Sequence, residues 1–368
     1  MSGDKVQIGR RDRNRKGGPV GEGSTNRRSV PRLADVAEQA GVSLASASRS
    51  LSGSDGVSES MAAHVREVAA RIGYIANVHA RTLAGGATST VGLIVHEIGD
   101  PYFSEIASGV IAEADRHRLT VQICHSGRDP GTELRQIRSL VAHRTDAIIV
   151  AGSGYVERAQ QAEAAAALRS FESSGGRVAV IGRHHLAADA VLPANREAGR
   201  AVAAHLLAQG HRRIGVLAGA AALTTVADRL AGVEDALVEA GMAPGALAVH
   251  HAAFTRDGGA AAAHELLDAR PDLTALLALN DAMAVGALSV LRSRGIGVPT
   301  EVSVAGFDDV SFAADLAPGL TTVRLPMAQM GAWALDLAMK PPAARRRTRR
   351  TGFELMARGS TGPVRAPS

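Results

Sequence analysis

The sequence has a single cysteine, few aromatic residues and no long apolar run. Because Cys124 is alone, the chain has no internal disulfide and no thiolate metal cluster, which is typical of the reducing cytoplasm. No apolar run approaches the ~18 residues that span a bilayer, and the basic N-terminus lacks the apolar core of a signal peptide. Aromatic residues make up 3% of the 368 residues, so Ala, Val, Leu and Ile must build the core. We therefore expect a cytoplasmic, globular protein of two or three domains.

The motifs of several enzyme classes are also missing. The sequence contains no GxxxxGK[ST], GxSxG or HExxH pattern, and no complete GxGxxG follows the first predicted strand. The pairs His184-His185 and His250-His251 lack acidic or cysteine partners, and adjacent residues of a strand point to opposite faces. We therefore expect no catalytic activity, no cofactor and no metal site.

Positive charge is concentrated at the N-terminus. Residues 1–29 contain eight Lys and Arg against three acids, which accounts for the whole formal net charge of +5. This Gly-rich tail without aromatic residues is predicted to be disordered. Two interpretations stay open: a solubilising leader, or an arm attracted to a phosphate backbone.

Residues 30–75 have the pattern of three short helices. In "RLADVAEQAG" apolar residues recur at helical spacing, and Gly41 ends the run. Ser43 is a suitable N-cap for a second helix over 44–51. A third helix follows Val57-Ser58, with an apolar stripe formed by Met61, Val65, Val68, Ala69 and Ile72. Three helices joined by short turns indicate a helix-turn-helix unit.

From residue 88 onward, short β-branched runs alternate with helical stretches. The predicted strands cover 90–95, 119–124, 146–152, 177–182, 212–219, 273–280 and 301–307. Helical patterns between them include 103–117, 131–143, 196–209, 227–241 and 281–294. This alternation predicts parallel sheets with crossover helices, arranged as two doubly wound lobes. Ligands of such sheets bind beyond the carboxyl ends of the strands.

Segments from Leu33 to Pro363 resemble the LacI family of bacterial transcription regulators. They include "RLADVAEQAGVSLASASRSLSG", "TVGLIV…DPYFSEIASG", "HLLAQGHRRIGVLAG", "LALNDAMAVGAL", "VPTEVSVAGFDD" and "RGSTGP", in the family's order. The resemblance implies an α/β fold, in which an all-α helix-turn-helix headpiece precedes a two-lobed, doubly wound effector domain like a periplasmic binding protein. It also implies a homodimer that binds pseudo-palindromic operator DNA and responds to a small polar effector, most often a sugar. Most members are repressors, although the sequence does not separate a repressor from an activator.

The resemblance also divides the chain. The basic tail covers 1–29, the headpiece 30–75, the hinge helix and linker 76–87, and the effector and dimerisation domain 88–368. Within that domain the N-lobe covers about 88–191 with a return segment at about 325–350. The C-lobe covers about 192–322 with the C-terminal strand. Only five residues follow "RGSTGP", too few for a tetramerising coiled coil, so we expect a dimer.

In the headpiece, the second helix corresponds to the recognition helix. The resemblance implies that Leu44, Ala45 and Arg49 read base edges, whereas Ser46 and Ser48 face phosphates or support the helix. A guanidinium can bond O6 and N7 of guanine together, so Arg49 is the expected guanine reader. Leu44 has an alternative role, because it also completes a core stripe with Ala47 and Leu51.

The segment "NVHARTLAGG" corresponds to the family's hinge helix. By resemblance, Leu83 wedges into the minor groove at the operator centre, and Ala80 is the small residue beside it. Such a short helix is unstable alone, so it would form only with DNA and the second subunit. The alternative is that Leu83 is a linker residue without a special role.

In the effector domain, the resemblance implies a ligand site between the lobes. Tyr102, Phe103 and Phe254 would supply aromatic walls, and the polar contacts would come from Arg229, Asn280, Asp308 and Arg183. A ring stacked on a sugar face with an Arg–Asp pair on its hydroxyls is sound carbohydrate chemistry. The alternatives are ordinary: a helix cap for Asp308, a core residue for Phe254 and a surface cation for Arg183.

Some positions depart from the family pattern. Ala194 and Leu325 stand where the family often has Asp and Gln, and Ser52 replaces the asparagine that ends the headpiece helix. The first two leave the effector open between a sugar, a nucleoside and a sugar phosphate. The run "RRRTRR" at 345–350 is predicted to be a solvated, exposed loop rather than a second DNA contact.

A different class of function shares the two lobes. A periplasmic-type sugar receptor, or an enzyme acting on sugars or nucleosides, would have the same effector fold. Neither explains the helix-turn-helix pattern of residues 30–84, so a DNA-binding regulator is favoured.

Overall fold

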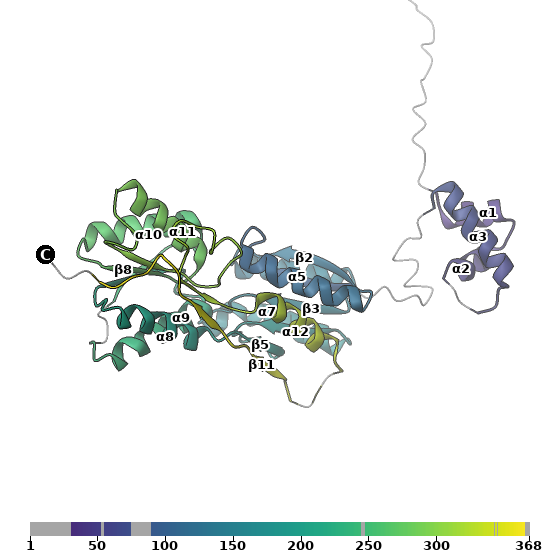
Figure 1. The fold of residues 1–368 in the computed structure, drawn as a ribbon. Helices are drawn as coiled ribbons and strands as arrows, with labels where there is room; N and C mark the ends of the chain where they lie inside the picture. Colours follow the sequence, from purple (N-terminus) through teal and green to yellow (C-terminus); the bar gives the residue numbers. More distant parts are fainter. Residues whose placement is uncertain are drawn as a thin grey trace, which may run out of the picture. The chain divides into compact units, whose positions relative to one another are not determined.

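The computed structural model describes residues 31–52, 55–74, 90–243, 247–341, 343 and 345–364. The chain divides into two compact units, Met1–Ala87 and Thr88–Ser368. Each unit has its own hydrophobic core. Figure 1 shows the helices of the first unit and the strands and helices of the second. Among the described residues, no helix is long and apolar enough to cross a membrane.

The first unit contains three helices, α1 (Leu33–Ala40), α2 (Leu44–Ser52) and α3 (Glu59–Ile72). Helix α1 ends at Gly41, whose φ of 65° is accessible to glycine at little cost. The Ser58 side chain caps α3 by accepting a hydrogen bond from the Met61 N–H. The predicted helix-turn-helix unit is confirmed, with bounds close to those expected.

One core assignment in this unit was wrong. Met61, predicted in the apolar stripe of α3, is 38% exposed. Its neighbour Ala62 is buried instead and lies one turn before Val65 on the same face.

In the second unit, the N-lobe has a six-stranded sheet in the order β11-β5-β4-β3-β1-β2. All pairings are parallel. Its strands are β1 (Thr90–Val95), β2 (Thr120–His125), β3 (Ala147–Ala151), β4 (Arg177–Ile181), β5 (Asp189–Leu192) and β11 (Thr348–Arg350). Its helices are α5 (Pro101–Arg116), α6 (Pro130–Ala142), the short 3-10 turn η1 (Arg158–Gln161), α7 (Ala162–Ser173) and α12 (Met327–Met339).

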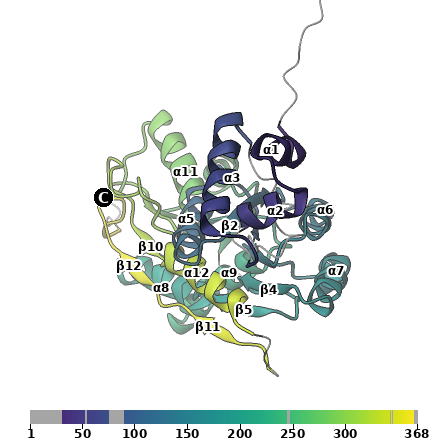
Figure 2. The ribbon, with the colours of Figure 1, turned by 90° about the vertical axis from the view of Figure 1, so that its right-hand side faces the viewer.

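Alternate residues of strands β1 to β5 pack on opposite helix layers. Val91 and Leu93 belong to the cluster that includes α5 and α12, whereas Ile94 belongs to the cluster with α6 and α7. Figure 2 shows the two layers on either side of the strands. This is the doubly wound arrangement that the sequence predicts.

The C-lobe repeats the plan with a four-stranded parallel sheet in the order β7-β6-β8-β9. Its strands are β6 (Ile214–Ala218), β7 (Ala248–His251), β8 (Ala275–Ala278) and β9 (Ser303–Ala305). Helices α8 (Asn195–Ala208) and α9 (Thr224–Glu239) lie on one side, and α10 (Arg256–Ala269) and α11 (Asp281–Ser293) on the other (Figure 1). A separate antiparallel pair joins β10 (Thr322–Arg324) and β12 (Glu354–Met356).

Helix α12 is held against α5 by glycines on both helices. A Cβ at Gly109 would lie 1.8 Å from the backbone oxygen of Ala328, and one at Gly331 would lie 2.1 Å from that of Ile106. Any side chain at either position would push the helices apart. A segment more than 200 residues later in the chain is thus part of the N-lobe core.

The arginine run 345–350 was predicted to be an exposed loop, and the second half of the run is instead a strand. Residues 348–350 form the edge strand β11, which pairs with β5. Arg347 bonds Asp189, and Arg349 bonds Asp336 and lies over the Trp333 ring. Charged residues are tolerated here because an edge strand is only partly covered.

Candidate DNA-binding helix and interlobe cleft

Helix α2 begins on a side-chain cap. The Ser43 Oγ accepts a hydrogen bond of 3.0 Å from the Ser46 N–H and lies 2.9 Å from the Ser46 Oγ. The cap satisfies one of the free N–H groups of the first turn. The start of the helix, which a recognition helix presents to base edges, is therefore well defined.

The outward face of α2 consists of small residues and one cation. Ser43, Ala45 and Arg49 are exposed, whereas Ser46 and Ser48 are half-buried. Leu44 keeps 54% of its surface exposed, so its alternative assignment to the core is wrong. Ala47 makes the core contact instead, with Leu51 at the core's edge.

Arg49 is the one charged side chain of this helix. Its Nη1 would lie 3.6 Å from a Cβ added at Gly56, which places the guanidinium beside the turn before α3. Within the described segments, its side chain makes no hydrogen bond or ion pair. Its donors are thus available to an acceptor outside the protein.

The hinge predictions cannot be placed on this structure. Ala80 and Leu83 lie outside the described residues, and their roles stay predictions.

In the second unit, the carboxyl ends of the strands of both lobes open into one cleft. Six of the seven predicted ligand residues line it: Tyr102, Phe103, Arg229, Phe254, Asn280 and Asp308. Tyr102 and Phe103 belong to the N-lobe, and the other four belong to the C-lobe. The position agrees with the rule that ligands of parallel sheets bind beyond the strand ends.

Arg229 organises the C-lobe wall of the cleft. Its Nε donates to Asn195 Oδ1 (2.9 Å), one terminal nitrogen to the Leu279 carbonyl, and the other to Asp308 Oδ1 (2.7 Å). The guanidinium also lies 3.7 Å from the centre of the Phe307 ring. Three of its five N–H donors are thus used inside the protein, and two remain.

Asp308 is held in an unusual backbone conformation. Its φ is 111°, a value that residues other than glycine rarely adopt. Burial raises the pKa of its carboxyl to about 7, although Arg229 acts in the opposite direction. A strained, buried carboxyl that faces a cleft is typical of a functional site.

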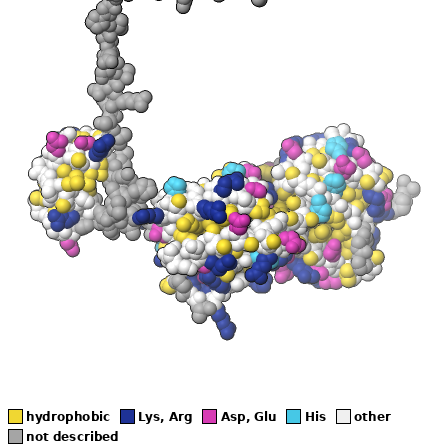
Figure 3. Space-filling view, turned by 180° about the vertical axis from the view of Figure 1, so that it is seen from behind, with side chains coloured by type: hydrophobic (Ala, Val, Ile, Leu, Met, Phe, Trp, Pro, Cys, Tyr) yellow, Lys and Arg dark blue, Asp and Glu magenta, His cyan; other side chains and the backbone are white. Residues whose placement is uncertain are grey.

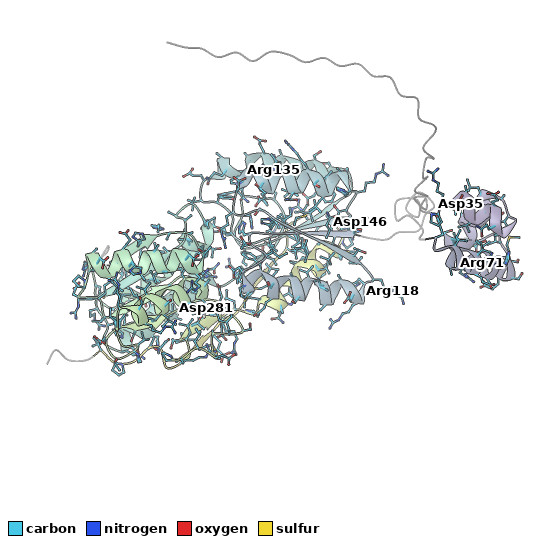
Figure 4. All side chains as sticks on the ribbon, turned by 90° about the horizontal axis from the view of Figure 1, so that it is seen from above. Asp35, Arg71, Arg118, Arg135, Asp146 and Asp281 are labelled. Atoms are coloured by element: carbon cyan, nitrogen blue, oxygen red, sulfur yellow. The ribbon has the colours of Figure 1, made fainter. Side chains whose placement is uncertain are left out.

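Asn280 and Asp281 combine a ligand-facing position with a structural role. Asn280 caps α11 by accepting a 2.9 Å hydrogen bond from the Met283 N–H. Asp281, labelled in Figure 4, accepts hydrogen bonds from the Thr322 hydroxyl and the Val310 N–H. Burial raises the pKa of Asp281 well above its usual value. These contacts fix the loop that holds Asp308.

The aromatic side chains of the cleft surround a cation that sequence reasoning missed. The Tyr102 and Phe103 rings meet edge to face, with centres 5.0 Å apart. The Arg128 guanidinium lies 6.0 Å from the Phe103 ring of the N-lobe and 5.7 Å from the Phe254 ring of the C-lobe. Its ion pair with Asp100 is long, at 3.7 Å. Arg128 therefore lies between the two rings that were predicted to stack on a ligand.

Four further polar side chains of the cleft were also missed: His96, Asp100, Ser153 and Thr225. Burial lowers the pKa of His96 to about 3, so its ring is neutral. Its Nε2 lies 2.8 Å from the Ser153 carbonyl, which only accepts, so Nε2 carries the proton. Nδ1 then accepts from the Ser126 hydroxyl at 3.0 Å.

Arg183 does not line the cleft. Its guanidinium makes a bidentate pair with Asp228 of α9, with distances of 2.7 to 3.2 Å. Arg183 follows β4 of the N-lobe and Asp228 belongs to the C-lobe. The pair thus joins the lobes beside the cleft.

Backbone contacts also join the lobes on this side. The Val156 N–H donates to the Ala222 carbonyl (2.7 Å), and the Thr224 N–H to the Gly154 carbonyl (3.0 Å). The Ser153 Oγ accepts from the Thr225 N–H at 3.0 Å. We name residues 153–156 and 222–225 the interlobe clasp.

The histidine pairs have separate hydrogen-bond partners. His184 Nδ1 accepts from Gln161, and its Nε2 lies 3.1 Å from the Gly152 carbonyl. His251 Nδ1 lies 2.7 Å from the Gly219 carbonyl. In the described part of the chain, no three His, Cys, Asp or Glu side chains are grouped to hold a metal ion.

Comparison with known proteins decides the family. Residues 32–77 match the model of bacterial regulatory proteins of the lacI family, and residues 203–361 match a periplasmic binding protein-like domain. The regulator GalR of Escherichia coli is 33% identical over 316 residues, which cover 83% of this chain and 88% of GalR. The chain belongs to the lacI family.

Two further relatives agree with this assignment. The repressor PurR of Vibrio atlanticus is 27% identical over 84% of this chain and 91% of its own length. The solved complex of the regulator CelR with cellobiose is 29% identical, covers 90% of this chain and 99% of that one, and superposes with a TM-score of 0.67. This lacI-family chain is a helix-turn-helix transcriptional regulator. The relatives are regulators rather than enzymes, so the receptor and enzyme alternatives are not favoured.

Proposed function

We propose that this lacI-family regulator is a cytoplasmic repressor that binds pseudo-palindromic operator DNA as a homodimer. A small polar ligand in the interlobe cleft, most simply a sugar, switches its operator affinity. The observation that carries the proposal is the Arg229–Asp308 pair, which combines a buried ion pair, two remaining N–H donors and a strained backbone at the strand ends.

For DNA recognition, we propose that α2 enters the major groove with Leu44, Ala45 and Arg49 towards the bases. The exposed Arg49 fits guanine, because two of its N–H donors can bond O6 and N7 together. Ser43, Ser46 and Ser48 keep the helix narrow and close to the phosphates. In the hinge, Ala80 and Leu83 would enter the minor groove at the operator centre.

The DNA proposal is tested by selecting binding sites from random duplexes. Arg49→Ala should relax the preference at one base pair of each half-site, at a cost of about 1–3 kcal/mol. Arg66→Ala is the matched control, because Arg66 is also exposed but pairs with Glu59 of its own helix. An identical selected motif for wild type and Arg49→Ala would show that Arg49 reads no base.

For the effector, we propose that Tyr102, Phe103 and Phe254 contact the apolar face of a sugar. Arg229, Asn280 and Asp308 would bind its hydroxyl groups, and Arg128 would move aside or bind a further oxygen. The cellobiose complex of CelR supports a sugar. Arg183 would act on lobe closure through Asp228 rather than on the ligand.

A thermal-shift screen of the full chain against sugars, nucleosides and sugar phosphates tests the effector. A ligand at 100 times its Kd adds about 2.7 kcal/mol of stability. The shift should disappear in Asp308→Asn. It should persist in the control Arg200→Gln, because Arg200 forms an exposed pair with Glu239 and does not line the cleft. A shift that survives Asp308→Asn would place the ligand elsewhere.

For the dimer, we propose that an apolar groove of the effector domain is part of the interface. Pro101, Val285 and Phe312 line this groove, and Ile98 beside it is 56% exposed. Apolar surface of this kind is typical of contact sites between proteins. Sedimentation analysis of Phe312→Lys should shift the mass from dimer towards monomer, and an unchanged mass would exclude the groove.

A further inference from the structure

Two helices of the N-lobe end on a residue that does not suit its backbone conformation. Among the described helices, α1, α3, α7, α8, α9 and α11 are each followed by a glycine with positive φ. After α5 and α6 the same position is Arg118 (φ 55°) and Arg144 (φ 56°). A side chain costs free energy in this region, and glycine avoids the cost.

Neither arginine recovers that cost through contacts in the protein. Both side chains are exposed, and in the described part of the chain neither makes a hydrogen bond or an ion pair. The bonds that close the helix ends come from backbone groups, with Leu119 N–H donating to Ala114 and Thr145 N–H to Leu140. A cation is favourable at a helix C-terminus. Arg116 already supplies one to α5, whereas the last turn of α6 has no basic residue and Arg144 is the cation at that end.

Both arginines lie at the end of the N-lobe sheet where the parallel strands begin. The strands are parallel, and Thr90 pairs with Thr120 while Val91 pairs with Ala147. The turns before β2 and β3 are therefore at the same end of the sheet as the first residue of β1. Figure 4 shows Arg118 and Asp146 at this same end of the lobe. Thr90, where β1 begins, is the first described residue after the headpiece in the sequence.

Further arginines lie at the same end of the sheet, before the start of β11. Arg345 is exposed and without a partner in the described segments. Arg346 and Arg347, which also precede β11, are paired with Glu172 and Asp189. Figure 3 shows many Lys and Arg side chains over the N-lobe. We name Arg118, Arg144 and Arg345 the basic rim.

The headpiece has little positive charge of its own. Residues 30–84 contain five Arg, no Lys and five acidic residues, so this segment is formally neutral. Phosphate contacts by Lys and Arg supply most of the sequence-independent affinity of DNA-binding proteins. Cations elsewhere in the chain would therefore add to its affinity for DNA, and the tail 1–29 and the effector domain are the two places that can supply them.

We propose that the basic rim is a second DNA contact, at which the effector domain binds the phosphate backbone of the duplex held by the headpiece. The inference rests on DNA binding by α2. Free, exposed guanidinium groups match phosphate oxygens in charge and geometry. Because they touch no base, they would raise affinity for every sequence equally.

The test is the salt dependence of DNA binding by the full-length protein. The probe is a duplex selected from random DNA by the wild type, together with an unrelated duplex of equal length. Arg118→Gly with Arg144→Gly removes two phosphate contacts and places the preferred residue at both turns. In the homodimer the two substitutions remove four contacts, so the slope of log K against log salt should fall by about 3.6, which corresponds to an affinity loss of about 4,000-fold at 0.1 M salt relative to 1 M.

Two further variants separate charge from structure. Arg118→Lys with Arg144→Lys keeps the charge and should keep the slope. Arg158→Gln with Arg292→Gln removes two exposed, unpaired arginines from other surfaces of the effector domain and should leave the slope unchanged. The glycine variant should be at least as stable as wild type in urea, because its turns are relaxed.

The outcomes are distinguishable. An equal loss on both duplexes, with wild-type stability, supports the basic rim as a phosphate contact. The proposal is overturned if the glycine variant keeps the wild-type salt slope. It is also overturned if the lysine variant loses as much slope as the glycine variant, because the loss would then not depend on charge. If the wild type selects no duplex at all, the proposed repressor function fails rather than this inference.

Discussion

Replacing Arg229 should destabilise the effector domain far more than replacing an exposed arginine. Arg229 is 2% exposed and bonds Asn195, the Leu279 carbonyl and Asp308. In Arg229→Met the apolar stem is kept, but all three polar partners lose their donor. Asp308, 4% exposed, is left as a buried carboxyl without its cation.

The size of the effect follows from that unpaired carboxyl. Breaking a buried ion pair by removing one partner costs about 3–5 kcal/mol. The matched control is Arg200→Met, since its pair with Glu239 leaves both side chains more than half exposed. An exposed pair contributes about 0–1 kcal/mol. The two substitutions remove the same charge, so the difference between their losses of unfolding free energy measures the effect of burial.

The loss should also depend on pH. Burial raises the pKa of Asp308 to about 7 even with Arg229 present, and removing the cation raises that pKa further. The folded variant then binds a proton that the unfolded chain releases, so its stability falls as pH rises. Urea unfolding of the full chain should therefore show a larger deficit at pH 8 than at pH 6.

A second substitution tests the cause. Arg229→Met with Asp308→Asn removes the unpaired charge, and asparagine tolerates positive φ. The double variant should be more stable at pH 8 than Arg229→Met alone. The reasoning is refuted if Arg229→Met costs no more than Arg200→Met, or if the double variant is less stable than the single one.

Three other predictions follow from single contacts. Burial raises the pKa of Glu133 to about 7, so the folded protein holds a proton that the unfolded chain loses above about pH 4.5. Glu133→Gln should therefore flatten the decline of stability between pH 5 and 8, and an unchanged urea profile would contradict this. Ser153→Ala removes the side-chain bond to Thr225 and should weaken the interlobe clasp by about 1 kcal/mol, visible as a larger radius in X-ray scattering. Ser43→Ala removes the α2 cap and should cost about 1 kcal/mol of headpiece stability, measured by hydrogen exchange of α2 against α3 as the internal reference.

Much of the fold was predictable because its elements are long and periodic. The predicted strand over 90–95 and the helix over 131–143 lie within a residue of β1 and α6. Five strands lie outside the seven predicted runs, β5, β7, β10, β11 and β12, and each has three or four residues. Such short strands are stabilised by their neighbours and have no pattern of their own. The edge strand β11 is the extreme case, because its cations pair with Asp189 and Asp336 from distant parts of the chain.

The cleft was only partly predictable for a related reason. Residues in "DPYF" and "GFDD" stand out in the sequence because they follow predicted strands. Arg128 follows β2 within an ordinary turn pattern, and only the closing of Phe103 and Phe254 around it places it in the cleft. Arg183 shows the opposite error, since it also follows a strand but is bound to Asp228. Position at a strand end indicates a candidate, whereas the partner that captures the side chain is decided by tertiary packing.

The arrangement of helix α9 gives a physical reason why a ligand in the cleft would act on the N-lobe. The same helix contains Thr224 and Thr225 of the interlobe clasp, Asp228 of the bridge to Arg183, and Arg229 of the cleft wall. A ligand that binds Arg229 better in one lobe arrangement than in another must shift the balance between them. The N-lobe strand β1 meets the cleft through His96 at its carboxyl end, and at its amino end it receives the chain from the headpiece. Because α9 is tied to both lobes within six residues, a change of lobe closure at the cleft is necessarily a change in the orientation of that strand relative to the C-lobe.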